Sequence, residues 1–576
     1  MSDGPVTGVS AVPGEEKAAA PSPATDPKAA APRETPAGRP RSAGGLIARW
    51  LVVLVPALVE LVAGGYKISQ PSLWRDEGYT REVVQWPIGK ILTMARHEDA
   101  VHAFYYVVMH PVVAAFGVSA TTLRMPSLIA SCAAAGLTAA LGARLARAGG
   151  LRAPLLTGLM AGLLFAALPL TTWYAQDARP YSMATLCAVG ATYLFVRAIE
   201  KHSGRLWVGY AVVIFILALL NLFALLLVVA HGVSLLIMRA RARRMSEDPR
   251  FAEPHVPLEE GELRPPHRLV ATMLDATRSW WTSVIVAGIV LLPFIVIGMS
   301  QSGQISWLTR PGVTTVKNII YDFAGTRDLV ILVAALAVVT CVADLFRRAS
   351  ALINVGVIAL PWLALPPVVL VVLSEVKPIY DERYIIFCMP AISLLVAAGL
   401  CYVGGYAAQR LGGQDVLRSR VVATVPVVIL LAVTALLLVH PQRTIRTTAA
   451  RPDDLRGVAA VLAANERPGD AVLYLPWGTR SVALGYPGPF QKLQDIGQRQ
   501  SAYASATLRG MEASGKLLST RDQHLSRMWV VTLTGQAIPD HTKLSHVEFA
   551  LIGRMHLIHR WKVKSVTLSL YTPAAS

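Results

Sequence analysis

Charge and cysteine are both scarce in this sequence, and each shortage limits what the protein can be. Only 16% of the 576 residues are charged and the mean hydropathy is +0.48, values that are typical of an integral membrane protein and not of a soluble enzyme. The five cysteines all lie inside apolar segments without ligand-like spacing. The sequence therefore predicts neither a disulfide framework nor a zinc site, and it indicates no cofactor and no divalent cation.

Acidic residues are fewer than basic ones, with 36 Asp and Glu against 54 Lys and Arg, which gives a formal net charge of +18. An excess of this sign could suggest a nucleic-acid partner. The Lys and Arg residues, however, fall mainly in short loops between apolar runs, which is where membrane topology places them. We therefore expect no nucleic-acid partner. We expect instead a multi-pass protein of the cell membrane, in contact with membrane lipids.

The first part of the chain predicts a tail followed by a series of membrane helices. Residues 1–45 have almost no large apolar side chains, so we expect a disordered tail. Arg39 and Arg49 flank the start of the first apolar run, Ile47 to Tyr66, and place the tail in the cytoplasm under the positive-inside rule. About eleven transmembrane helices are predicted within residues 46–440. The spans after the first are expected at 122–145, 152–173, 180–199, 206–220, 222–238, 281–300, 328–346, 350–374, 384–404 and 421–440.

Two apolar segments do not fit a simple series of spans. Residues 206–238 are either one long tilted helix or two spans separated by a turn at Asn221. Residues 103–116 are too short for a span and contain Pro111. If they crossed the membrane, the later basic loops would all fall outside, whereas a helix along the outer surface leaves those loops in the cytoplasm. We therefore expect a juxtamembrane helix there, within a first outer loop of residues 67–121.

From about residue 441 the composition changes to that of a soluble domain. An amphipathic helical stretch ends at Ala464, and a second helical pattern covers residues 503–514. Strands are predicted at 471–475, 528–533 and 565–571. The sequence thus predicts a small extracytoplasmic α/β domain over residues 441–576.

A dense group of ionisable and aromatic residues directly follows the first span, in the segment Pro71 to Thr80. It contains Trp74, Arg75, Asp76 and Glu77 in succession. Ionisable groups at the end of a membrane helix are costly to desolvate, so they either face water in an ordinary loop or take part in chemistry.

Two later outer loops, 173–181 and 375–384, have the same character, and the predicted topology places them on the same face as the first loop. Together the three loops also contribute Asp99, His102, Asp177, Arg179, Lys377, Arg383 and Tyr384. Carboxylates can accept a proton from a sugar hydroxyl, and cations can hold a phosphate leaving group. This combination favours transfer of a group from a phosphate-linked donor to an alcohol.

The motif Trp74-x-Asp76-Glu77-x-x-Thr80, followed by the pair Tyr105-Tyr106 in the juxtamembrane segment, resembles the GT-C membrane glycosyltransferases. The branch it resembles is that of the protein O-mannosyltransferases and lipid A aminoarabinose transferases. The segment 174–181 and the pair Arg383-Tyr384 also match patterns of that branch. The resemblance covers roughly residues 47–440 and is specific through the combination of motifs.

This resemblance implies a GT-C fold, a polyprenyl-phosphate sugar donor, catalysis on the extracytoplasmic face and inversion at the anomeric carbon. We expect transfer of a hexosyl or pentosyl group, mannose for example, to a glycan, lipid or protein of the cell envelope. Asp76 resembles the essential first-loop aspartate and is expected to be the general base. The chain departs from the family in one segment, because relatives carry an acidic residue followed by Pro-Pro-Leu where this chain has Asp99-Ala100-Val101-His102-Ala103-Phe104.

The predicted site therefore has two kinds of residue. Asp76 and Glu77 are the expected catalytic groups, although Glu77 alternatively orients the site or binds a metal. The expected substrate ligands are Arg75, Asp99, His102, Tyr105, Asp177, Arg179, Lys377, Arg383 and Tyr384. For Lys377 and Arg383 the alternative is a snorkelling anchor at a helix end.

Two other classes of protein compete with an enzyme: a membrane transporter and a non-catalytic scaffold that binds glycolipid. A transporter places ionisable residues in the centres of its spans, along a path, whereas here they cluster in the outer loops. The sequence also shows no internal repeat of the kind from which many secondary transporters are built. We therefore favour the enzyme.

Overall fold

The chain folds mainly into helices, and its strands are confined to the C-terminal part. The computed structural model describes residues 43–247, 265–346, 351–411, 416–448, 450–521, 525–534 and 543–573. Within these ranges the residues from Ile47 onward form one compact unit. Of the predicted tail, residues 1–42 lie outside the described part of the chain.

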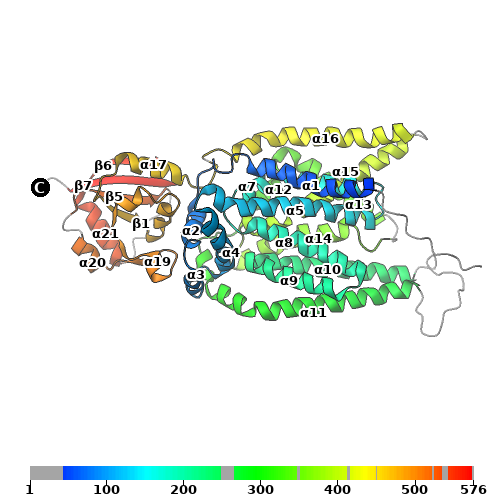
Figure 1. Cartoon of the computed structure of the whole chain (residues 1–576), viewed down its shortest axis with the longest axis horizontal. Coiled ribbons are helices and arrows are strands. Elements are labelled where there is room, and N and C mark those ends of the chain that lie inside the picture. Colours follow the sequence, from blue (N-terminus) through cyan, green and yellow to red (C-terminus); the bar gives the residue numbers. More distant parts are fainter. Residues whose placement is uncertain are drawn as a thin grey trace, which may run out of the picture. The chain divides into compact units, whose positions relative to one another are not determined.

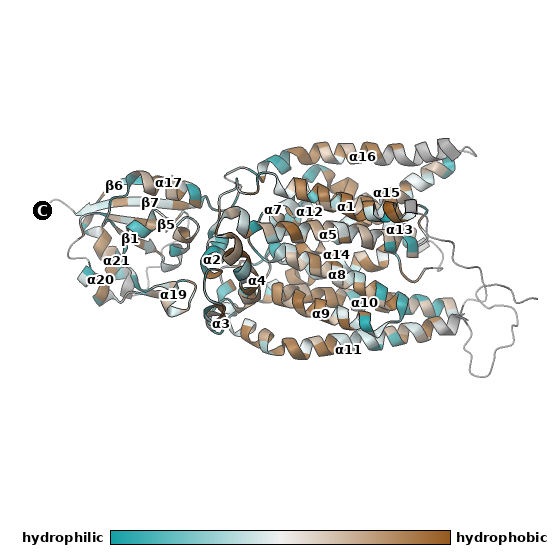
Figure 2. Cartoon of the chain, viewed as in Figure 1, coloured by the Kyte–Doolittle hydropathy of each residue, from teal (hydrophilic) through white to brown (hydrophobic). Residues whose placement is uncertain are grey.

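Apolar helices lie side by side in a bundle (Figure 1), and apolar residues cover most of their length (Figure 2). In the described ranges, seven helices are long and apolar enough to cross a membrane, or nine if each of two bent pairs is one span. The helices of the bundle are α1 (Ala43–Gly65), α5 (Ala120–Ala148), α6 (Pro154–Ala167), α7 (Pro169–Ala175), α8 (Tyr181–Lys201), α9 (Gly204–Leu220), α10 (Leu226–Glu247), α11 (Pro265–Ser300), α12 (Val313–Ala324), α13 (Val330–Phe346), α14 (Val355–Val376), α15 (Met389–Leu411) and α16 (Val416–Thr444).

The predicted number of about eleven spans is not confirmed. Helix α9 has only 17 residues, and the apolar part of α16 within the described residues is Val428–Thr444. The pairs α6–α7 and α12–α13 are bent by 66° and 78°. Pro169 opens α7, and because it has no backbone N–H it cannot continue the hydrogen-bond ladder of α6.

The chain breaks between α9 and α10, so residues 206–238 are not one long helix, and whether α9 is a separate span stays a prediction. Asn221 is extended, with φ −156°, and its side-chain oxygen accepts a hydrogen bond from the backbone N–H of Phe223 at 3.2 Å. This side chain replaces a helical backbone bond and starts a short turn before α10.

Large apolar side chains face outward on several of these helices. Leu58 on α1, Ile289 on α11 and Leu436 on α16 are 56%, 66% and 72% exposed. Exposed apolar surface of this extent is what a bilayer covers. The chain is therefore a multi-pass membrane protein.

Three bundle helices begin beside the first loop and end with a basic residue in their last turn. These residues are Arg147 on α5, Lys201 on α8 and Arg410 on α15. The arrangement agrees with the predicted topology, which places these helix ends in the cytoplasm. The orientation in the membrane stays a prediction.

The first loop folds into three helices, α2 (Arg75–Val83), α3 (Ile88–Ala95) and α4 (Ala100–Phe116). Helix α4 covers the predicted juxtamembrane segment, has 17 residues and contains Pro111. It is not among the helices long enough to span, as expected. Tyr105, Tyr106 and Met109 on α4 are fully buried in the core that the bundle helices share. Helix α4 therefore packs on the bundle and holds the first loop in place.

The C-terminal domain contains a five-stranded sheet with the order β2-β1-β5-β7-β6. β1 runs parallel to β2 and β5, whereas β7 is antiparallel to β5 and β6. The strands of this sheet are β1 (Ala471–Leu475), β2 (Gln494–Asp495), β5 (Met528–Leu533), β6 (Met555–Val563) and β7 (Val566–Pro573). The helices around it are α17 (Leu455–Asn465), α18 (Ser481–Leu484), α19 (Ala502–Ser505), α20 (Gly515–Arg521) and α21 (Lys543–Gly553).

The sequence predicted β1, β5 and β7 and missed β6. It was wrong about residues 503–514. Only α19 is helical there, and Met511–Glu512 form strand β4, which pairs with β3 (Gln498–Gln500). Gly510, at φ +78°, sits between the two elements and ends any helical pattern.

Candidate active site

A cavity of about 1000 Å³ lies where the first loop, two later loops and the C-terminal domain meet. The first loop contributes Asp76 and His102 to its wall, and the segment after α7 contributes Arg179. Arg383 comes from the turn before α15, and Trp477 comes from the C-terminal domain. The structure thus brings the three predicted outer loops together.

Helix α2 separates the two acidic residues of the motif, because neighbouring residues on a helix point about 100° apart. Asp76 faces the cavity. Glu77 faces the bundle and is fully buried, with its two carboxylate oxygens 2.7 and 2.6 Å from the Arg124 guanidinium. It also accepts the N–H of Ala178 at 2.9 Å.

The ion pair of Glu77 and Arg124 holds the loop together. Arg124 also donates to the backbone carbonyls of Ile68, Pro71 and Ser72. Burial by itself would raise the pKa of Glu77, but the charge and hydrogen bonds of Arg124, together with Arg451 and the N–H of Ala178, outweigh burial and lower the pKa. The structure therefore does not bring Glu77 into the cavity, and Arg124 occupies the oxygens that a metal would need.

Asp76 is held between two arginines at the cavity wall. Its Oδ2 atom is 2.6 Å from Nη1 of Arg383 and 3.6 Å from Nη2 of Arg179. Burial by itself would raise the pKa of Asp76, but the charges of Arg179 and Arg383 outweigh burial and lower it. The side chains of Arg383 and Arg179 are 12% and 7% exposed, against 24% for Asp76, so the carboxylate is the most accessible member of the cluster.

Arg383 is enclosed by aromatic rings. Its guanidinium carbon lies 5.4 to 5.9 Å from the ring centroids of Trp74, Trp307 and Tyr384. A second carboxylate, Asp381, accepts from it at 3.0 Å. Stacking on aromatic faces suits arginine, whose planar group can still point its N–H donors at an anion.

Asp99, His102 and Tyr106 form a second polar group on the same cavity wall. One carboxylate oxygen of Asp99 lies 2.6 Å from Nδ1 of His102, and the other accepts the Tyr106 hydroxyl at 2.6 Å. Burial by itself would raise the pKa of Asp99, but the contact with His102, together with Arg179 and Tyr106, outweighs burial and lowers the pKa. The segment 99–104, which differs from the pattern of the family that the sequence resembles, is therefore part of the cavity.

Three of the predicted ligands lie away from the cavity. Asp177 is fully buried and accepts from Nε1 of Trp74 at 2.9 Å. Tyr105 is also fully buried. Lys377 is exposed, and its Nζ donates to the hydroxyl of Ser302 at 3.0 Å. The remaining predicted ligand from the motif, Arg75, lines the cavity and pairs with Asp453 at 2.9 Å.

Several cavity residues were missed in the sequence. Tyr106 belongs to the Tyr pair on which the family resemblance rests and could have been predicted from it, but only Tyr105 is among the predicted ligands. Trp307 and the C-terminal residues Trp477, Arg509 and Thr534 also line the cavity. No local pattern marks them, because they come from loops that only the tertiary fold brings to this position.

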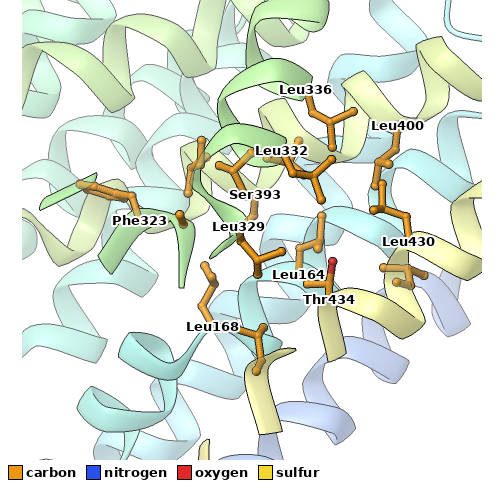
Figure 3. Close-up of a pocket in the computed structure, with 16 residues that line it drawn as sticks. Leu164, Leu168, Phe323, Leu329, Leu332, Leu336, Ser393, Leu400, Leu430 and Thr434 are labelled. Atoms are coloured by element: carbon orange, nitrogen blue, oxygen red, sulfur yellow. The ribbon is translucent and has the colours of Figure 1, made fainter. Parts of the chain in front are cut away.

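A second, apolar pocket of about 40 Å³ lies among α6, α12, α13, α15 and α16 (Figure 3). Leu164, Leu336 and Leu430 are among its lining residues, and Ser393 and Thr434 supply its hydroxyls. It shares no lining residue with the polar cavity. Because it has no ionisable group, it is not a candidate for the reaction.

Among the described residues, no group of three or more His, Cys, Asp or Glu side chains is arranged to hold a metal ion. Two of the acidic residues at the cavity are instead engaged with arginine or histidine, in the pairs Asp76–Arg383 and Asp99–His102.

No protein-family model and no curated protein sequence matches the chain. Among solved structures it is similar to ArnT from Cupriavidus metallidurans bound to undecaprenyl phosphate, with 15% identity, a TM-score of 0.49, and coverage of 92% of this chain and 98% of that chain. It is also similar to the Archaeoglobus fulgidus oligosaccharyltransferase in complex with zinc and sulfate, with 11% identity, a TM-score of 0.45, and coverage of 84% and 68%. The archaeal oligosaccharyltransferase AglB from the same organism, in complex with an inhibitory peptide and a dolichol-phosphate, gives 10% identity, a TM-score of 0.43, and coverage of 84% and 69%.

Proposed function

We propose that the protein is an inverting glycosyltransferase that moves a sugar from a polyprenyl-phosphate donor to a hydroxyl group on an extracytoplasmic glycan, lipid or protein. The observation that carries the proposal is the pair of guanidinium groups, Arg179 and Arg383, on Asp76 in a large cavity beside the membrane helices. A lipid-linked donor needs such a cavity, because its prenyl chain stays in the bilayer while its sugar phosphate must reach water.

The two arginines suit the leaving group. When the bond between the anomeric carbon and the phosphate oxygen breaks, negative charge grows on that oxygen, and preformed cations stabilise it. Arg383 can present two parallel N–H donors to the phosphate. Asp76 fixes both guanidinium groups and faces the positive charge that develops on the sugar ring.

The reaction also needs a base for the acceptor hydroxyl, and the cavity offers two candidates. One is Asp76, the residue predicted from the motif. The other is the pair Asp99 and His102. Both lie on the cavity wall, so either is within reach of an acceptor bound there.

Features of the bundle weigh against a transporter. His231, on α10, is fully buried, and its two ring nitrogens contact the hydroxyls of Thr192 and Tyr210 at 3.1 and 3.0 Å. An intramembrane histidine with both nitrogens occupied ties α8, α9 and α10 together, which is typical of helix packing. The polar cavity, in contrast, is lined by several ionisable residues, Arg179 and Arg383 among them.

The test is a transfer assay. Membranes containing the full chain are incubated with polyprenyl-phosphate mannose, arabinose or glucose carrying a labelled sugar, and label in envelope glycan, lipid and protein is measured. Membranes with Arg383→Ala serve as the matched control, because this variant removes one of the two cations. We expect one of the three labels to move in the wild type. Equal transfer in wild type, variant and empty membranes would refute the proposal.

A further inference from the structure

We propose that His102, oriented by Asp99, is the general base that takes the proton of the acceptor hydroxyl. The role that the motif predicted for Asp76 thus passes to a residue outside that motif. The inference rests on the proposed glycosyl transfer and identifies the proton acceptor within it.

The first support is the geometry of the two side chains. Oδ1 of Asp99 lies 2.6 Å from Nδ1 of His102. A carboxylate at this nitrogen favours the tautomer with hydrogen on Nδ1, which leaves the lone pair on Nε2. Among the described residues no hydrogen bond reaches Nε2, and the side chain, 17% exposed, lines the cavity. Nε2 is therefore in a position to receive a proton from a bound hydroxyl.

The second support is the backbone that carries Asp99. Asp99 adopts a left-handed conformation with φ 58° at the N-terminal end of α4, yet its carboxylate makes no capping hydrogen bond. The side chain of Gln301, from the segment after α11, accepts the N–H of Ala100 at 2.9 Å instead. An aspartate at this position ordinarily caps its own helix. Here another segment supplies the cap, and the carboxylate is left to His102 and Tyr106.

The third support is that Asp76 is poorly suited to the role. Its Oδ2 atom is bound by Arg383 at 2.6 Å, and Arg179 lies 3.6 Å away. Two guanidinium groups lower the pKa of this carboxyl against the effect of burial. A base whose pKa is lowered takes up a proton less readily, and general-base catalysis weakens accordingly.

The two polar groups form one connected network. Nη1 of Arg179 donates to the Tyr106 hydroxyl at 3.4 Å, and Tyr106 donates to Oδ2 of Asp99 at 2.6 Å. The base and the arginines that would hold the donor phosphate therefore line the same cavity.

The step balances without a further reactant. The acceptor oxygen forms a bond to the anomeric carbon while the bond from that carbon to the phosphate oxygen breaks. The phosphate leaves with the bonding electron pair, and Arg179 and Arg383 face its charge. The hydroxyl proton goes to Nε2 of His102, which releases it to water after the glycosylated acceptor leaves.

The experiment measures turnover as a function of pH on the full chain in proteoliposomes, with the labelled polyprenyl-phosphate sugar that the wild type uses. A neutral imidazole is the active form, so turnover should fall at low pH, where His102 becomes protonated. The titratable and charged groups that face or neighbour His102 are Asp99 and Tyr106, Asp76 on α2, Arg179 after α7, Glu98 and, from the C-terminal domain, Arg509. The matched control is His97→Gln, an exposed histidine of the same loop.

We expect His102→Gln to lower turnover by about 10²- to 10⁴-fold and to abolish the fall at low pH. Asp99→Asn should move that fall to lower pH, because the carboxylate no longer stabilises the imidazolium. Labelling of His102 by diethyl pyrocarbonate can be measured by mass spectrometry across pH and does not depend on turnover. In Asp99→Asn, the loss of labelling at low pH should move to lower pH by the same amount. Asp76→Asn should keep the fall, and His97→Gln should match the wild type.

Two results would overturn the assignment and can be told apart. Wild-type turnover and pH dependence in His102→Gln, or loss of the fall only in Asp76→Asn, would refute the base and leave the glycosyl transfer standing. An absence of transfer from every labelled donor by the wild type would refute the proposed function, and the base with it.

Discussion

Asp76 and Glu77 are neighbours in the sequence but belong to ion-pair clusters with opposite properties. Glu77 and Arg124 are fully buried and satisfy each other. Asp76 is 24% exposed and shares its charge with two arginines at a cavity. The same residue types, one position apart on α2, therefore serve the fold on one face and can serve the chemistry on the other. What separates the two roles is access to water and substrate.

The largest effect expected from this comparison of Asp76 with Glu77 is a loss of stability when Glu77 is replaced. Glu77→Gln leaves Arg124 buried without a counter-charge, and the loss of one partner of a buried ion pair costs about 3–5 kcal/mol. We expect a lower melting temperature and poor yield. Turnover per folded molecule should stay near that of the wild type, because Glu77 does not line the cavity.

The matched variant is Asp76→Asn, and both are measured for melting temperature and turnover on the same purified samples. Asp76→Asn should melt close to the wild type and have a reduced but measurable turnover. If Glu77→Gln instead kept its stability and lost turnover, the division between the two faces of α2 would be wrong.

The split between the two acids shows what the sequence could and could not predict. The motif places Asp76 and Glu77 together, and the spacing of a helix implies that they diverge. The motif does not show which of the two faces of α2 packs against the bundle. That depends on Arg124, which lies 47 positions further along the chain and on a membrane helix.

Other parts of the structure divide in the same way. Local hydropathy predicted most helices of the bundle and the strands β1 and β5. These elements are runs of apolar residues, so a few consecutive residues are enough to identify them. The cavity residues Trp477 and Arg509 carry no such signal, since their position follows from how the C-terminal domain packs on the first loop. One such contact is the hydrogen bond from the N–H of Leu508 to Glu98 at 2.7 Å.

A third carboxylate tests whether a dedicated cation is what keeps a buried acid ionised. Asp177 is as buried as Glu77, but one of its oxygens has no hydrogen-bond partner among the described residues. Burial, followed by the nearby charge of Glu77, raises the pKa of Asp177 to about 6. A folded-state pKa above the unfolded value stabilises the protein at low pH, and that contribution is lost as pH rises through about 6.

Asp177→Asn removes this ionisation while an amide oxygen can still accept from Trp74. We therefore expect the variant to be more stable than the wild type at pH 7.5, by up to about 3 kcal/mol. The gain should shrink toward pH 4, where the carboxyl of the folded wild type is already protonated. Melting temperatures across this range decide the matter. A gain that did not change with pH would mean that Asp177 stays ionised.

A smaller effect, on turnover, is expected from changing the arginine that binds Asp76. Arg383→Lys keeps the positive charge but loses the planar pair of donors and the stacking on Trp74 and Trp307. Loss of a charge-assisted hydrogen bond costs about 1.5–3 kcal/mol, so turnover should fall roughly ten- to a hundred-fold, and further in Arg383→Ala. Unchanged turnover with a lowered melting temperature would make Arg383 a structural residue.

The smallest effect concerns a second cation of the same predicted loop, Lys377. The sequence grouped it with Arg383 as a phosphate ligand, but its ammonium group is exposed and bonds to Ser302, outside the cavity wall. An exposed charge in water interacts weakly with groups at a distance, and salt screens it further. We expect Lys377→Ala to change turnover by less than about twofold and to leave the Michaelis constant for the labelled donor unchanged. A loss as large as that of Arg383→Lys would show that the loop rearranges on donor binding and brings Lys377 to the phosphate. Only in that case would the two cations have the same role.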